Sequence, residues 1–99
     1  MALPHSENTD RLFRAILSLN SLEECYDFFE DAFTIKEIQD ITQRFQVATL
    51  LQEGKSYQEV NEITGASTAT ICRVKKCLLY GNSGYLLALE RICPTEEQP

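Results

Sequence analysis

The chain has 99 residues, of which 43% are hydrophobic, and a formal net charge of −6, values that indicate one small globular domain. No run of about 18 apolar residues is present, so we expect no membrane-spanning helix. The first residues lack the basic start and apolar core of a signal peptide, and we therefore expect a cytoplasmic protein.

Capping signals and apolar residues at helical spacing predict three helices in the first half of the chain. Residues 1–8 are expected to be flexible, and Asn8 or Thr9 to cap the first helix. The next two helices each follow a capping box: Ser21 with Glu24, and Thr34 with Glu37. Gly54 is expected to end the third and longest helix.

The first two predicted helices are apolar on nearly all of their faces. The residues concerned are Leu12, Phe13, Ile16, Leu17, Tyr26, Phe28 and Phe29. A chain of this size has too little other surface to cover them. We therefore expect an intertwined, two-fold symmetric homodimer whose core is shared between chains, with a monomeric helical bundle as the alternative.

Residues 56–79 have the pattern of a helix-turn-helix. Ser56 with Glu59 forms a capping box, Gly65 supplies a left-handed turn residue, and Ser67 caps the second helix. Val60 and Ile63 are expected to form the buried edge of the first helix. The second helix is expected to bury a stripe with helical spacing: Ile71, Val74 and Leu78.

After this motif, residues 81–84 predict a turn and residues 85–92 a short last helix. Residues 94–99 are expected to form a flexible acidic tail. The prediction is therefore an all-α protein of about six helices, with a single domain over residues 9–93.

The outer face of the second motif helix carries small and basic side chains. Small residues at its start, Thr68 and Ala69, allow close approach to DNA base edges, and a threonine hydroxyl can hydrogen-bond there. Arg73 and Lys76 can hold phosphates, and Arg73 can also fork onto a guanine. The predicted DNA-contact set is Gln58, Asn61, Ser67, Thr68, Ala69, Cys72, Arg73 and Lys76.

The charge is segregated along the chain in a way that suits DNA binding. Residues 55–76 hold four basic and two acidic side chains, a balance of +2, so the rest of the chain carries −8. No acidic residue occurs between residues 63 and 89. The acidic remainder repels nucleic acid at a distance, so we expect weak non-specific binding and a steep dependence on salt.

The sequence shows no pattern of a metal, cofactor or catalytic site. The four cysteines, Cys25, Cys72, Cys77 and Cys93, form no C-x-x-C pair, and the single histidine is His5. We expect buried, inert cysteines except at Cys72, which falls on the outer face of the second motif helix. Without a nucleophile–base pair or phosphate loop, we expect no enzyme.

Residues 34–76 resemble the Trp repressor family, and the chain as a whole is most similar to its YerC/YecD branch. The resemblance rests on Arg44, Gly54 and above all the run Gly-Ala-Ser-Thr-Ala-Thr-Ile-Cys-Arg at residues 65–73. It implies an all-helical intertwined homodimer that represses transcription at specific DNA sequences. Gln58 and Asn61 stand where that repressor has basic residues, so a different operator is expected.

The resemblance also implies a ligand pocket, at the positions Thr34, Arg44, Arg73 and Cys77. In the repressor a glycine follows the second arginine and leaves room for an indole ring, whereas Val74 follows Arg73 here. We therefore do not expect tryptophan to bind, and the sequence names no other effector. A helical dimeric protein-interaction module that has lost DNA binding remains the alternative function.

Overall fold

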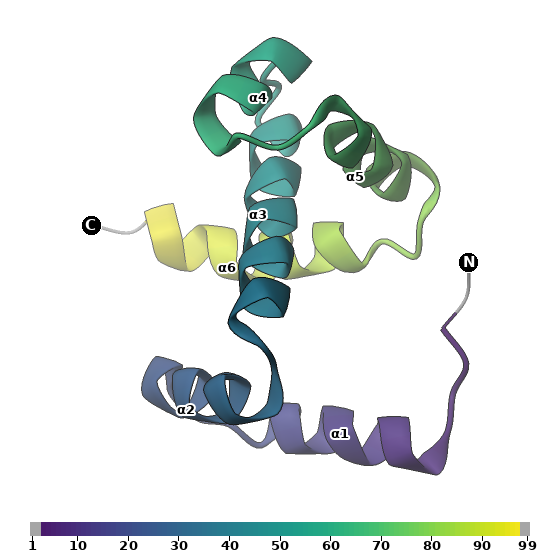
Figure 1. The fold of residues 1–99 in the computed structure, drawn as a ribbon, viewed down its shortest axis with the longest axis vertical. Helices are drawn as coiled ribbons and strands as arrows, with labels where there is room; N and C mark the ends of the chain where they lie inside the picture. Colours follow the sequence, from purple (N-terminus) through teal and green to yellow (C-terminus); the bar gives the residue numbers. More distant parts are fainter. Residues whose placement is uncertain (1–2, 98–99) are drawn as a thin grey trace. The chain divides into compact units, whose positions relative to one another are not determined.

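The computed structural model describes residues 3–97 and contains six α-helices and no strand within that range (Figure 1). The helices are α1 (Glu7–Leu17), α2 (Leu22–Ala32), α3 (Ile35–Gln52), α4 (Tyr57–Thr64), α5 (Thr68–Tyr80) and α6 (Gly84–Glu97). The all-α class is thus confirmed. No helix in residues 3–97 is long and apolar enough to cross a membrane. The chain forms two compact units, an N-terminal unit up to Ile38 and a C-terminal unit from Gln39.

Serine caps begin both helices of the N-terminal unit. The Oγ of Ser6 accepts the Thr9 N–H at 3.0 Å, and the Oγ of Ser21 accepts the Glu24 N–H at 3.1 Å. Helix α1 therefore begins at residue 7, and the predicted cap at Asn8 or Thr9 is wrong because Ser6 already accepts the N3 amide. Residues 7 and 8, expected in the flexible segment, are helical.

Between residues 3 and 38, the N-terminal unit has no buried core of its own. None of the residues of α1 or α2 is buried, and Leu17 and Leu22 are 82% and 79% exposed. The aromatic side chains contact one another locally. The Phe28 and Phe29 rings meet edge to face with their centroids 5.6 Å apart, and the Phe29 and Phe33 rings stack with their centroids 4.9 Å apart. These helices are defined by local hydrogen bonds rather than by a core within this chain.

The C-terminal unit contains a compact core drawn from α3, α4, α5, α6 and the turn between α4 and α5. Its buried residues are Val47, Ala48, Leu51, Val60, Ala66, Ile71, Val74 and Leu89. Helix α6 joins the core through Leu89 and through Tyr85, whose ring centroid lies 6.3 Å from that of Phe45. The predicted stripe of α5 is confirmed, with Leu78 partly buried against the core.

The predicted buried edge of α4 is only half right. Val60 is fully buried, whereas Ile63 is 54% exposed. Because successive residues turn by roughly 100°, a residue three positions on lies about 60° around the helix from Val60. An eight-residue helix meets the core along one narrow line, which Val60 occupies, so Ile63 is left outside it.

The ends of α3 and α6 differ in how well the sequence marks them. Gly54 has a φ of 90°, and the N–H groups of Gly54 and Lys55 donate to the Leu51 and Leu50 carbonyls, as predicted for a glycine C-cap. Helix α6, in contrast, continues to residue 97, so the backbone of residues 94–97 is helical where a flexible tail was expected. A proline inside a helix removes one backbone hydrogen bond and crowds the preceding turn, and α6 continues through Pro94 despite this cost. Residues 98 and 99 of the expected tail lie outside the described residues.

Candidate nucleic-acid interface

The predicted helix-turn-helix is confirmed in α4 and α5, and local hydrogen bonds explain its limits. Ser56 Oγ accepts the Glu59 N–H at 3.1 Å, and the Glu59 carboxylate accepts the Ser56 N–H at 3.2 Å. Gly65 ends α4 with a left-handed φ of 73°. Ser67 Oγ then accepts the Thr70 N–H at 3.2 Å and starts α5. Together these contacts fix where α5 begins.

The capping box also lowers the pKa of a carboxyl group in the first turn of α4. Hydrogen bonds from the backbone N–H and the side chain of Ser56 lower the pKa of the Glu59 carboxyl below its ordinary value of 4.5. The carboxylate is therefore ionised at neutral pH, and its negative charge lies at the helix N-terminus, where the helix dipole favours it.

All eight predicted DNA-contact residues are exposed, but the two on α4 already bond within the motif. The side-chain amide of Asn61 donates to the Ala66 carbonyl at 2.8 Å, and the Gln58 amide donates to the Glu62 carboxylate at 3.3 Å. Asn61 is therefore committed to shaping the turn. Of the six predicted contacts on or next to α5, only Ser67 has a side-chain hydrogen bond in the described part of the chain, and its partner is Thr70 in the first turn of the same helix.

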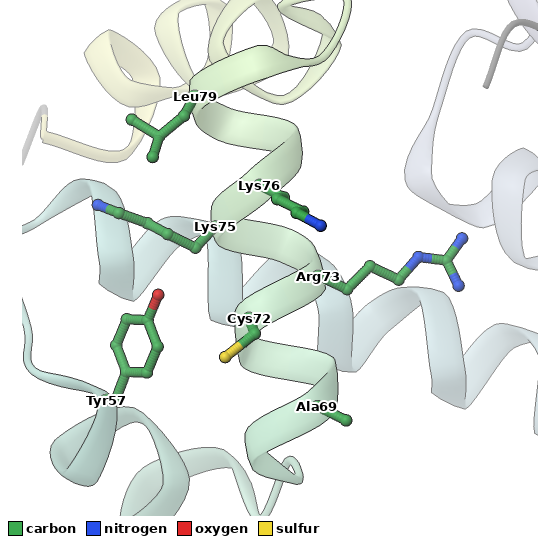
Figure 2. Close-up of a pocket in the computed structure, with 7 residues that line it drawn as sticks. All are labelled: Tyr57, Ala69, Cys72, Arg73, Lys75, Lys76 and Leu79. Atoms are coloured by element: carbon green, nitrogen blue, oxygen red, sulfur yellow. The ribbon is translucent and has the colours of Figure 1, made fainter.

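The outer face of α5 and the start of α4 enclose an open groove of about 510 Å³, which we call the outer groove (Figure 2). It is lined by Tyr57, Ala69, Cys72, Arg73, Lys75, Lys76 and Leu79. In Figure 2, Tyr57 rises from α4 on the same side as Cys72 and Lys75, whereas Arg73 extends from the other side of α5. Three cations and no acidic side chain line this groove, so its field favours a polyanion.

Three residues of the outer groove were missed by sequence reasoning: Tyr57, Lys75 and Leu79. Lys75 is one residue before a predicted contact and belongs to the basic run, a signal that could have included it. Tyr57 is the first residue of α4, and only the packing of α4 against α5 brings its ring beside the outer face. No periodicity in the sequence predicts that contact.

The two arginines of the predicted ligand pocket lie together. Arg44 and Arg73 line a polar pocket of about 250 Å³ that also contains Asp40, Gln43 and Thr70. Arg44 Nε donates to the backbone carbonyl of Asp40 at 3.4 Å. The two guanidinium groups and the Thr70 hydroxyl can bind an anionic or polar group, while the Asp40 carboxylate offsets part of their positive charge and the Gln43 amide already donates to the Thr64 carbonyl.

The other predicted pocket residues serve elsewhere. Thr34 Oγ1 accepts the Glu37 N–H at 3.1 Å as the cap of α3, and the Glu37 carboxylate accepts the Thr34 N–H at 2.8 Å. Cys77 lines a different cavity, of about 430 Å³, beside Phe45 and Tyr85. Val74 is 1% exposed and is packed in the core.

No group of histidine, cysteine or acidic side chains within the described part of the chain could hold a metal ion. Cys25, Cys72 and Cys77 are free thiols. Cys72 is exposed as predicted, whereas the prediction that Cys25 and Cys77 are buried is wrong, because Cys25 is half-buried and Cys77 is exposed. Cys77 is exposed because it follows Ile71 by six residues and therefore lies about 120° around the helix from that buried side chain. The side chain of Cys93 lies outside the described residues.

Comparisons with known proteins agree with this geometry. Residues 7–93 match the sequence model of the family described as Trp repressor protein. An uncharacterized protein of Bacillus subtilis (strain 168), YerC, is 56% identical over 89 residues, which cover 90% of this chain and 86% of the relative.

Two solved structures are also similar. A TrpR-like protein from Eubacterium eligens ATCC 27750 is 53% identical with a TM-score of 0.85, over 88% of this chain and 90% of that one. A putative Trp repressor from Staphylococcus aureus is 46% identical with a TM-score of 0.86, over 89% of this chain and 88% of that one. At these identities the likeness extends to the family and not only to the fold.

Proposed function

The chain belongs to the Trp repressor protein family, and from this premise we propose that it is a sequence-specific DNA-binding regulator of transcription that represses as a homodimer. The observation that carries the proposal is the outer groove, where Arg73, Lys75 and Lys76 line the exposed face of a helix-turn-helix and no acidic side chain is part of the groove lining. A polyanionic duplex is the ligand that fits this surface. We assign the protein no catalytic activity and no cofactor, and we expect it to act in the cytoplasm.

In this mechanism α5 enters the major groove of DNA with its N-terminal end foremost. Thr68 and Ala69 are exposed in its first turn, and their small side chains let the helix approach base edges closely. Arg73 and Lys76, one to two turns further on, hold phosphates or a guanine edge. Ser67, at the helix N-terminus, lies where backbone N–H groups attract a phosphate. Cys72 faces the same groove.

Dimerisation rests on a separate observation, the exposed apolar side chains of α1 and α2. Leu17, Leu22 and Tyr26 are each at least two-thirds exposed, which is costly in water for a chain this small. A second copy of the same helices covers such a surface symmetrically. Two α5 helices related by the two-fold axis then read half-sites about one helical turn apart.

Tryptophan is not the effector in this proposal. Val74 is buried in the core directly after Arg73, and its branched side chain fills space that an indole ring next to Arg44 and Arg73 needs. The polar pocket between the two arginines suits a smaller anionic group, a phosphate of the DNA backbone included. No effector is named by the residues present.

A second candidate function is a dimeric protein-interaction module that has lost DNA binding. The net charge of −6 favours this function. So does the hydrogen bond from Gln58 to Glu62, because a Gln58 side chain that contacts DNA cannot keep its amide on Glu62. In that case the groove cations would bind an acidic protein segment, and duplex DNA would not be retained at moderate salt.

The deciding experiment is selection of genomic DNA fragments on the purified full-length protein at moderate salt, followed by sequencing of the retained fragments. Recovery of a palindrome with half-sites about one turn apart supports the dimeric regulator and names its operator. Retention of no motif by folded, dimeric protein overturns the regulator proposal in favour of the interaction module.

A further inference from the structure

Both backbone and side-chain hydrogen bonds hold the turn between α4 and α5. The Gly65 N–H donates to the Asn61 carbonyl at 2.8 Å, and the Ala66 N–H donates to Thr64 Oγ1 at 3.1 Å. The Ala66 carbonyl accepts from the Asn61 amide. Each of these partners belongs to α4 or to the turn itself, so they shape the turn without tying it to the rest of the unit.

Gln43, which lies outside the motif, connects the turn to the rest of the unit. Its side-chain Nε2 donates to the Thr64 carbonyl at 3.1 Å in a partly buried position, across 21 residues of sequence. Helix α3 carries Gln43 on the same stretch as the core residues Val47 and Ala48. The bond therefore joins the carbonyl that opens the turn to the helix on which the core is built.

We propose that Gln43 is a positioning residue that sets the angle at which α5 presents its first turn to DNA. The inference rests on the proposed function. Thr64 precedes the contact residues Thr68 and Ala69 by only four and five positions, with the short turn between them. A base-reading side chain must be held within about 0.5 Å of its productive place, so a small rotation of the turn misaligns both contacts.

A glutamine amide is well matched to this role. The Thr64 carbonyl needs a donor, and an amide provides one without bringing a charge into a partly buried site. If the amide is replaced by an apolar side chain of equal length, the core volume is kept, but the carbonyl loses its partner and the turn its attachment to α3.

The test compares Gln43→Met with the matched control Gln46→Met, which changes an exposed glutamine three residues further along α3. Operator affinity is measured on the fragment selected by the wild-type protein, and non-specific affinity on unrelated duplex, with the active fraction fixed by stoichiometric titration. The Thr64 carbonyl ¹³C resonance reports directly whether the hydrogen bond is lost.

We expect Gln43→Met to bind the operator about five-fold more weakly, because a misaligned first turn of α5 weakens about one base hydrogen bond, and to bind unrelated duplex as the wild type does. The Thr64 resonance moves in this variant only. Non-specific affinity is kept because the phosphate-binding cations are untouched, whereas a merely structural role would lower both affinities or the active fraction.

Two results overturn the inference: operator binding by Gln43→Met equal to that of Gln46→Met, or equal losses on operator and unrelated DNA. Failure of the wild-type protein to select any fragment is a different outcome. It overturns the proposed function itself, and this inference with it.

Discussion

The two units of this chain reach helical structure by different routes. In the N-terminal unit, α1 and α2 have capped ends but no buried residue, and their leucines and tyrosine face solvent. In the C-terminal unit, four helices enclose a core in which Val47, Ala48 and Val60 are fully buried. Local signals are equally good in both, so capping alone does not distinguish a self-sufficient fold from one that needs a partner surface.

The difference assigns separate tasks to the two units. A unit with its own core can hold α5 at a fixed angle whatever its surroundings, as a DNA-reading helix requires. A unit of capped helices with exposed apolar faces is suited to assembly, because burial against a second copy supplies the stability that the single chain lacks.

The largest effect is expected from placing charge on the exposed apolar faces of the N-terminal unit. Each leucine that a dimer buries contributes about 1.5–3 kcal/mol, so Leu17→Asp with Leu22→Asp should weaken association by at least about 3 kcal/mol. Sedimentation equilibrium should show a shift from dimer to monomer. The control Leu3→Asp, outside the helices, should keep the wild-type mass, and an unchanged mass in the double variant would contradict the division.

The next largest effect is expected on stability, where two isoleucines of the same motif differ in burial. Ile71→Ala empties a fully buried site and should lower the free energy of unfolding by about 2–5 kcal/mol. Ile63→Ala, at a side chain 54% exposed, should lower it by less than about 1 kcal/mol. Urea denaturation of both variants measures the contrast, and equal losses would show that Ile63 is buried in the assembled protein.

A smaller effect tests the outer groove. Arg73→Ala should weaken operator binding by about 1–3 kcal/mol and, if the guanidinium holds a phosphate, reduce the slope of affinity against salt by about one. Arg91→Ala makes the same charge change at an exposed site on α6 and should leave binding nearly unchanged. Titration of a labelled operator at several salt concentrations distinguishes the two, and similar losses would mean that net charge alone controls affinity.

The smallest effect concerns the cap of α4. Because the folded-state pKa of Glu59 is lowered, its contribution to stability is present above the unfolded value of 4.5 and is lost as pH falls through the folded value. As the pH falls from 4.5 through the lowered folded-state pKa, Glu59→Gln should therefore lose less thermal stability than the wild type. Glu53→Gln, at an exposed site before the motif, should follow the wild-type curve. Parallel curves for all three would remove Glu59 from the acid response.

The sequence predicted the parts of the fold that depend on neighbours along the chain. The Ser56–Glu59 and Thr34–Glu37 capping boxes, Gly54 and Gly65 form as expected because each acts over three to five residues. The errors arose where one signal competed with another. Ser6 capped α1 before Asn8 or Thr9 could, and α6 continued past Pro94.

The candidate site was predicted less completely. Exposure of the α5 contact residues followed from periodicity, because the buried stripe of Ile71 and Val74 leaves the opposite face outside. The role of Asn61 did not, since its amide folds back onto the Ala66 carbonyl five residues away. Tyr57 was missed altogether, because its place in the outer groove depends on how α4 packs on α5.

By itself, then, the sequence determined the all-α class, the limits of the helix-turn-helix and the family, because capping and hydrophobic periodicity are local and the Gly65–Arg73 run is specific. Only the tertiary structure decided that Ile63 is left outside the core and that Gln43 bonds to Thr64 across 21 residues. Such contacts depend on the angles at which helices cross, and those angles are set by the packing of the whole core rather than by any short segment.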